Sequence, residues 1–188
     1  MKVIFSKYGL SMGTITAALL LSGFAHSAAV GIDAAKSKVT ATFKQIGVPV
    51  EGVFTKTAGS IQFDAAKPEA STASLQIDTA AFDLGMDDYN AEVRKKEWFD
   101  SKTYPQATFV STGFKALGGE RYQAAGKLSI KGKSVDVSFP VTVKRQAAAT
   151  VFTGSIPVSR KLFAIGDAGW NEVVDDAVTV NFSIVQAH

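Results

Sequence analysis

The sequence predicts an all-β fold, an eight-stranded antiparallel barrel with one short helix capping an end. Three observations support this prediction. Apolar and polar residues alternate with a period of two over most of the chain after residue 37, a pattern typical of strands with one face in water. Short turns such as "LGGE" at 117–120 and "IKGK" at 130–133 separate the alternating runs. Several runs exceed the usual ~5–6 residues of a strand, and long tilted strands suit a closed barrel better than a small sandwich.

The first 29 residues have the layout of a secretory signal peptide. Lys2 and Lys7 precede an apolar run, and the small residues of "AHSAA" follow it. The apolar run is shorter than the ~20 residues that a membrane-spanning helix needs, which disfavours the alternative of a membrane anchor. We therefore expect cleavage after Ser27 or Ala29 and a single exported domain over residues 30–188.

The strands are predicted from runs that carry one apolar and one polar face. In one of them, Val137, Phe139 and Val141 alternate with Asp136, Ser138 and Thr142. Pro140 lies inside this run and predicts a bulge or a local edge, because proline cannot donate to a ladder. The predicted strands span residues 38–46, 50–63 with a bend near Gly59, 72–78, 107–114, 121–131, 134–145, 150–158 and 176–186.

One charged segment, "LGMDDYNAEVRKKEWFD", breaks the alternation. Asp87 and Asp88 stand where a helix would start, and basic residues 94–96 stand where it would end. This order suits N-capping and the helix dipole. We predict a helix over residues 86–97, after which Pro105 forces the chain into an extended conformation.

This helix is predicted to close one end of the barrel. Met86, Tyr89 and Val93 share a side and are expected to face inward. Trp98 and Phe99 would then wedge at the seam where the helix gives way to the next strand. The alternative is that Trp98 and Phe99 fill ordinary core.

The composition excludes several kinds of chemistry. Cysteine is absent, which rules out disulfides and thiolate nucleophiles. His26 lies at the predicted cleavage site and His188 is the last residue, so neither suits the buried base of a catalytic triad. The adjacent acids at 87–88 and 175–176 could bind calcium or serve a glycosidase, but helix capping and a solvated turn explain them more simply. We expect no catalysis, cofactor or metal, and the near-neutral chain without its leader gives no reason to expect nucleic acid as a partner.

Basic residues gather in several short clusters with two interpretations. They either solubilise outer strand faces and turns, or ring a barrel mouth and receive an anionic head group. The clusters are Arg94-Lys95-Lys96, Lys127/Lys131/Lys133, Lys144-Arg145 and Arg160-Lys161.

Three segments resemble the YceI-like family. They are "KEWFDSKTYPQATFVST" at 96–112, "GKLSIKGKSVDVSFPVTV" at 126–143 and "GSIPVSRKLFAIGDAGW" at 154–170. The resemblance implies an extended, lipocalin-like barrel in the periplasm, whose lumen takes a polyisoprenoid chain for binding or carriage without turnover. Some members are associated with membrane b-type cytochromes. That association points to an isoprenoid quinone as ligand and to such a cytochrome, or another envelope protein, as partner.

Two departures from the family pattern concern polar residues. The family often has His-Ser where this chain has Lys36-Ser37, and residues 89–94 retain only Arg94 of the family's Arg-Asp-x-His-Leu-Arg string. The head-group contacts attributed to that helix therefore cannot be carried over. The apolar strand positions agree better, so the resemblance supports chain binding more than any head-group preference.

We predict a lumen whose apolar side chains bind the ligand by burial of its hydrocarbon. An eight-stranded barrel either fills with side chains or holds one small ligand, and periodicity alone favours filling. Two alternatives remain, a solid-cored structural or stress-related interaction module and a carboxylate-dependent envelope enzyme using Arg160. The predicted ligand-binding residues are Phe43, Phe54, Phe63, Leu75, Ile77, Trp98, Phe99, Phe109, Tyr122, Leu128, Ile130, Val137, Phe139, Val141, Phe152, Ile156, Phe182 and Ile184.

Overall fold

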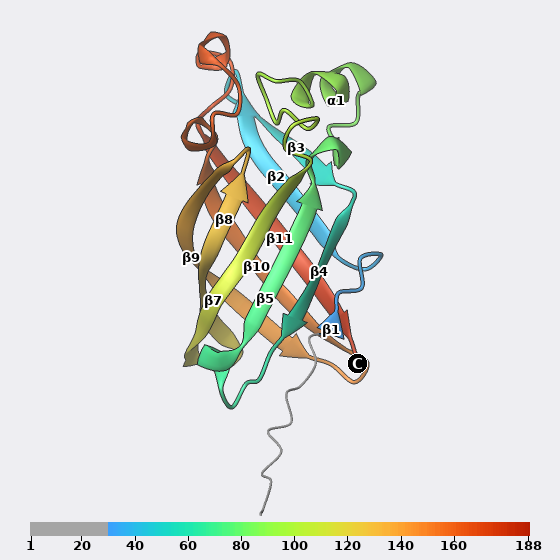
Figure 1. Ribbon diagram of the computed structural model, residues 1–188, viewed down its shortest axis with the longest axis vertical. Helices are drawn as coiled ribbons and strands as arrows, with labels where there is room; N and C mark the ends of the chain where they lie inside the picture. Colours follow the sequence, from blue (N-terminus) through green and yellow to red (C-terminus); the bar gives the residue numbers. More distant parts are fainter. Residues whose placement is uncertain (1–29) are drawn as a thin grey trace, which may run out of the picture.

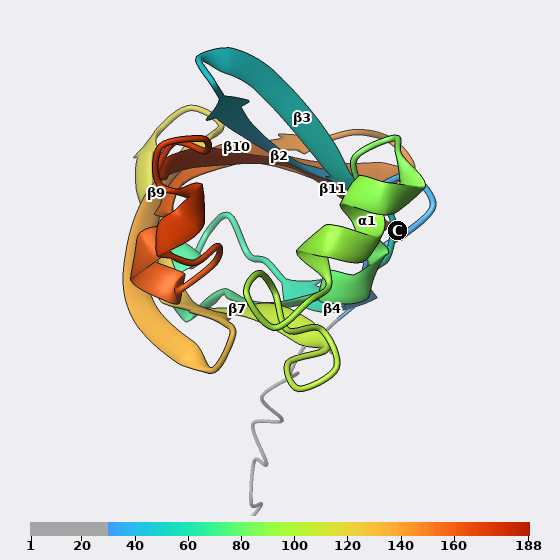
Figure 2. The ribbon, with the colours of Figure 1, turned by 90° about the horizontal axis from the view of Figure 1, so that it is seen from above.

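The structure is a computed structural model and describes residues 30–188; the predicted signal peptide lies outside the described residues. One antiparallel sheet curls around a central axis, with a single short α-helix at one end (Figures 1 and 2). The sheet order is β1-β4-β5-β7-β8-β9-β10-β11-β2-β3-β6. The strands are β1 (Val30–Gly31), β2 (Lys38–Gln45), β3 (Val48–Phe54), β4 (Thr57–Gln62), β5 (Thr72–Asp78), β6 (Phe82–Asp83), β7 (Gln106–Gly118), β8 (Arg121–Ile130), β9 (Lys133–Arg145), β10 (Ala149–Ser159) and β11 (Ala177–Ala187).

The sheet has 11 strands, so the predicted count of eight is wrong. The predicted strand 50–63 is two strands, β3 and β4, because Thr55 leaves the ladder and directs both its N–H and its hydroxyl to the Ala81 carbonyl. Gly59 does not mark the bend. A Cβ there would lie 2.3 Å from the Ser74 carbonyl oxygen, so this glycine permits the close approach of β5. β1 and β6 have two residues each, too few to produce an alternating pattern.

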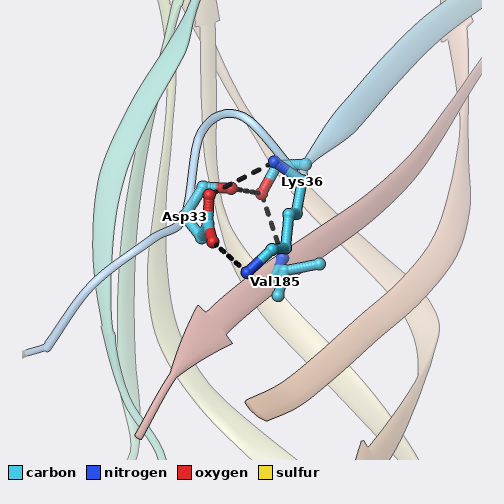
Figure 3. A network of polar contacts seen from close by, with 4 residues as sticks. Asp33, Lys36 and Val185 are labelled. Carbon is cyan, nitrogen blue, oxygen red and sulfur yellow. Dashed lines mark hydrogen bonds and ion pairs between the residues drawn. The ribbon is translucent and has the colours of Figure 1, made fainter. Parts of the chain in front are cut away.

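Hydrogen bonds between the segment after β1 and strand β11 close the seam of the barrel. The Asp33 N–H donates to the Val185 carbonyl at 2.7 Å, and the Val185 N–H donates to Ser37 Oγ at 3.0 Å. Ser37 Oγ in turn donates to the Asp33 carbonyl at 2.7 Å. Figure 3 shows the polar contacts around Asp33, Lys36 and Val185. Lys36, where the family often has histidine, forms an ion pair with Asp33 at 3.0 Å. Since β1 pairs with β4, this network joins β4 to β11.

Pro140 marks a local edge of the sheet, which is one of the two outcomes predicted for this proline, and no bulge occurs there within residues 30–188. β9 pairs with β8 in unbroken register through Gln123↔Pro140. On its other side β9 pairs with β10 only as far as Val141↔Gly154. Within residues 30–188, the first part of β9 therefore has no ladder partner on that side, and the missing N–H of Pro140 costs no ladder bond there.

Helix α1 (Asp87–Val93) lies at one end of the barrel (Figures 1 and 2) and is shorter than predicted. Val93 is buried, but Met86 is 55% and Tyr89 47% exposed, so the predicted inward stripe is wrong at both positions. The hydrogen bonds of Asn90 explain why the helix is rotated so that Met86 and Tyr89 are exposed. Its side chain accepts from the Leu84 N–H at 2.7 Å and donates to Asp83 at 2.9 Å, which turns the Asn90 side of the helix toward the barrel.

The predicted acidic cap of α1 is also corrected. The N-cap residue is Met86, and no side chain among residues 30–188 caps the helix; Asp87 and Asp88 lie in its first turn, where their charges suit the helix dipole. Among residues 30–188, no helix is long and apolar enough to cross a membrane. Four short 3-10 helices complete the structure: η1 (Pro68–Ala70), η2 (Thr79–Ala81), η3 (Lys161–Phe163) and η4 (Ala168–Trp170).

Candidate ligand-binding lumen

Cavities at three places along the barrel of residues 30–188 are relevant to ligand binding. The central cavity, between Phe109, Phe139 and Phe182, has a volume of about 110 Å³. The helix-end cavity, beside Val93 and Trp98, has about 90 Å³ and shares wall residues with the central cavity. The walls of both are almost wholly hydrocarbon. The seam-end cavity lies at the opposite end of the barrel and has about 300 Å³, with a wall of mixed polarity.

Thirteen of the predicted ligand-binding residues line the central cavity. They are Phe54, Leu75, Ile77, Phe99, Phe109, Leu128, Ile130, Phe139, Val141, Phe152, Ile156, Phe182 and Ile184. Phe43 and Trp98 line the helix-end cavity, and Phe63 and Tyr122 line the seam-end cavity. Val137 lines none of the three and packs half-buried against the core. Ligand contact by these residues stays a prediction.

Several lumen residues lie outside the predicted set. Val39, Val158 and Val180 line the central cavity, and their places on apolar strand faces were a usable signal. Phe114 also lines it, five positions after Phe109, so no period-two pattern places both rings on one face. A register shift between Ser111 and Gly113 in the β7–β8 ladder turns Phe114 inward. A β-bulge of this kind re-aims the side chains that follow it.

A group of aromatic rings separates the central cavity from the seam-end cavity. Phe63 lies edge-on to Phe114, Tyr122 and Phe152, with ring centroids 5.6, 5.0 and 5.6 Å away. Phe114 and Phe152 line the central cavity, whereas Phe63 and Tyr122 line the seam-end cavity. We call these four residues the aromatic partition.

A second aromatic group lies between the central and helix-end cavities. Phe54 contacts Phe82 at 4.5 Å and Phe99 at 6.1 Å between ring centroids, and both Phe54 and Phe99 line the two cavities. Beyond them, Trp98 packs against Trp170 at 5.1 Å. The Trp98 indole N–H is buried and has no hydrogen-bond partner among the described residues. Phe54 and Phe99 therefore belong to the shared wall of the two cavities.

Arg160 is buried beside the helix-end cavity but has no free donor. Its side chain is 2% exposed. Nη2 donates to the Val174 carbonyl at 2.7 Å, and Nη1 donates to the Ile165 carbonyl at 2.9 Å. Nε and Nη2 also donate to Asp175, Trp170 and Asn171 oxygens. Arg160 therefore organises the segment between β10 and β11 and is not available to act on a bound molecule.

The described carboxylates lie away from the apolar lumen. Neither the central nor the helix-end cavity has an acidic residue in its wall. Asp176 accepts hydrogen bonds from the Lys161 N–H and from the Ser159 hydroxyl, both at 2.8 Å. These contacts, the Lys161 N–H first, lower the pKa of Asp176 below its usual range. Among residues 30–188, no three metal-ligating side chains cluster.

The YceI-like domain matches residues 31–186. The chain belongs to the YceI-like family. Among its relatives, a UPF0312 protein of Pseudomonas savastanoi pv. phaseolicola is 33% identical over 138 residues, which cover 72% of this chain and 68% of that protein.

Solved structures show the same YceI-like fold. Burkholderia cenocepacia BcnA is 46% identical, with a TM-score of 0.80 over 82% of this chain and 98% of BcnA. A polyisoprenoid binding domain from Saccharophagus degradans, implicated in plant cell wall breakdown, is 19% identical, with a TM-score of 0.70 over 85% of this chain and 99% of that domain. The predictions of the YceI-like family and of its lipocalin-like antiparallel barrel are confirmed. Arg94, which this YceI-like chain retains from the family's helix string, is exposed and lines none of the three cavities.

Proposed function

We propose that this protein is a periplasmic, non-catalytic carrier that holds a polyisoprenoid lipid or an isoprenoid quinone in its lumen. The observation that carries the proposal is the pair of adjoining hydrocarbon-walled cavities of about 110 and 90 Å³. Packed interiors leave few voids larger than a water molecule. An apolar cavity of about 150 Å³ stays dry and takes up benzene, so cavities of this size favour an apolar occupant.

Burial of ligand hydrocarbon supplies the binding free energy, about 25 cal/mol for each Å² of apolar surface removed from water. The polyisoprenoid binding domain of Saccharophagus degradans has the same fold, and this likeness supports a polyisoprenoid as the class of ligand. Periplasmic location rests on the leader-like residues 1–29. A membrane b-type cytochrome or another envelope protein is the partner that the family resemblance suggests for cargo exchange.

Two observations weigh against the alternatives. An enzyme using a carboxylate with Arg160 needs an acid in the lumen and a free guanidinium, whereas the described apolar cavities have no acidic wall residue and the Arg160 donors are occupied. A solid-cored module needs a filled barrel, whereas the central and helix-end cavities remain between the side chains.

The proposal is tested by purifying the protein from its native envelope, extracting it with organic solvent and identifying the extract by mass spectrometry. Val180→Trp would fill the lumen, because Val180 lines both apolar cavities. Thr179→Trp is the matched control on the exposed face of β11. We expect an isoprenoid with the native protein and with Thr179→Trp, and little with folded Val180→Trp. Absence of any isoprenoid from the native protein, or equal recovery from both variants, would contradict the proposal.

A further inference from the structure

The seam-end cavity differs from the rest of the lumen. Residues from β4, β8, β9, β10 and β11 line it, together with Val30 and His188. Its wall is half polar, whereas the central and helix-end cavities present hydrocarbon. Ile61 lines both this cavity and the central one, and the aromatic partition stands between the two. The seam-end cavity is therefore a polar chamber at one end of an apolar lumen.

Two side chains in this chamber carry hydrogen-bond donors. Arg145 continues the inward face of Val141 and Val143 at the end of β9, and within residues 30–188 no carboxylate lies within 4.0 Å of its guanidinium. Tyr122 lines this cavity and is only 7% exposed, and within residues 30–188 the side-chain hydrogen bonds of the cavity wall come from Thr150 and Gln186 instead. The hydroxyl of Thr150, by contrast, is already shared with His188 at 2.9 Å.

The helix end offers no comparable place for a charged group. The guanidinium of Arg160 is saturated by carbonyl oxygens and Asn171, and the indole N–H of Trp98 is sealed from solvent. A charge moved into a hydrocarbon wall without partners has a large desolvation cost. An amphiphile in this lumen thus has its polar end favoured at Arg145 and its apolar end favoured between the hydrocarbon walls of the helix-end cavity.

We propose that the seam-end cavity binds the anionic, phosphate-type head group of a lipid whose chain passes the aromatic partition into the lumen. Arg145 supplies the charge-assisted hydrogen bonds, and the Tyr122 hydroxyl supplies a further donor. The inference rests on the proposed function, and it adds the position of the head, its chemical class and the direction of the chain.

The first test compares two probes with one chain, geranylgeranyl phosphate and geranylgeraniol, at constant ionic strength. We expect the native protein to bind the phosphate about tenfold more tightly, the gain typical of a charge-assisted hydrogen bond. Arg145→Gln should abolish this preference, and Tyr122→Phe, which keeps the ring, should reduce it severalfold. Lys144→Gln removes the same charge from the outer face of β9 and is the control. An undiminished preference in Arg145→Gln overturns the inference.

Two further arms separate the remaining outcomes. Inorganic phosphate that displaces geranylgeranyl phosphate with comparable affinity would identify a free-anion site and overturn the lipid head group. If neither lipid binds the native protein, the proposed function itself fails. If both bind equally well, only the head-group assignment fails.

The second test determines which way the isoprenoid chain of the lipid runs along the lumen. Both tryptophans of the protein, Trp98 and Trp170, lie at the helix end. A bromine at the far end of the isoprenoid chain should quench their emission, whereas a bromine beside the phosphate should not. The reverse pattern would show that the head group lies at the helix end and would overturn the inference.

Discussion

The ring of Phe63 lies edge-on to the ring of Phe152, with centroids 5.6 Å apart and planes at 83°. Phe63 follows β4 and Phe152 lies in β10, so this contact spans the barrel between its polar chamber and its apolar lumen. The partition matters for function because its rings lie between the two cavities that a bound lipid is proposed to occupy.

Phe63→Ala should open the aromatic partition. We expect release of a bound isoprenoid to accelerate about tenfold, because affinity changes within one site act mainly through the off-rate. The stability loss should stay below the ~3–5 kcal/mol of a fully buried Phe→Ala change, since Phe63 is only half-buried. Stopped-flow displacement measures the rate, with Val110→Ala on the outer face of β7 as control. An unchanged off-rate would show that loading does not pass Phe63.

Phe139→Asp tests the inward face of β9. Phe139 is buried and packs against Phe109 and Phe182 at 5.2 and 5.8 Å between ring centroids, so an unpaired carboxylate there should cost several kcal/mol in folding or binding. Thr142→Asp lies on the other face opposite Arg121 and should change stability by less than about 0.5 kcal/mol. Urea unfolding of both variants measures the contrast, and equal damage would contradict the face assignment.

Trp98 should report on ligand at the helix end. In a Trp170→Phe background, we expect its emission to shift when an isoprenoid saturates the protein, because Trp98 lines the helix-end cavity. Trp98→Ala should speed ligand loss and destabilise the fold by about 3–5 kcal/mol. Trp98→Phe should be milder, since it removes an N–H that has no partner. If the Trp98 emission does not change when ligand is added, and the ligand off-rate is unchanged in Trp98→Ala, then Trp98 is an ordinary core residue.

Arg160→Lys should destabilise the segment between β10 and β11. Lysine cannot reproduce the planar set of donors, and each buried acceptor left unpaired costs about 1–3 kcal/mol. We expect a total loss of about 3 kcal/mol in urea unfolding. Lys161→Gln, which changes the exposed neighbour, should be nearly silent. If Arg160→Lys lowers the free energy of unfolding no more than Lys161→Gln does, the structural role of Arg160 is contradicted.

Asp176→Asn should weaken the fold in a pH-dependent way. The hydrogen bonds from Lys161 and Ser159 lower the pKa of Asp176 in the folded protein. Its carboxylate therefore stabilises the fold above the unfolded pKa, and this contribution is lost as the pH falls through the folded pKa. The Tm difference between native protein and variant should be largest near pH 7 and shrink as the pH falls from about 4 to 2. A constant difference across this range would contradict the assignment.

Alternation along single strands predicted much of the lumen wall. Phe139, Val141, Phe152 and Ile184 all lie on apolar strand faces in the sequence and line the central cavity in the structure. This works because successive side chains of a strand point to opposite faces. The same local pattern cannot reveal a bulge. Phe114 was therefore absent from the predicted lumen residues although it lies beside Phe63.

The strand-rich fold, the inward face of most strands and the absence of cysteine chemistry were predictable from the sequence alone. Three features required the tertiary structure: the closure between Ser37 and Val185, the rotation of α1 through Asn90, and the juxtaposition of Arg145 with Tyr122 at the seam end. The alternation of side chains between the two faces of a strand is a local property, because the extended backbone alone produces it. Seams, helix rotation and cavities depend on hydrogen bonds and packing between residues far apart in the chain, whose partners no local pattern specifies.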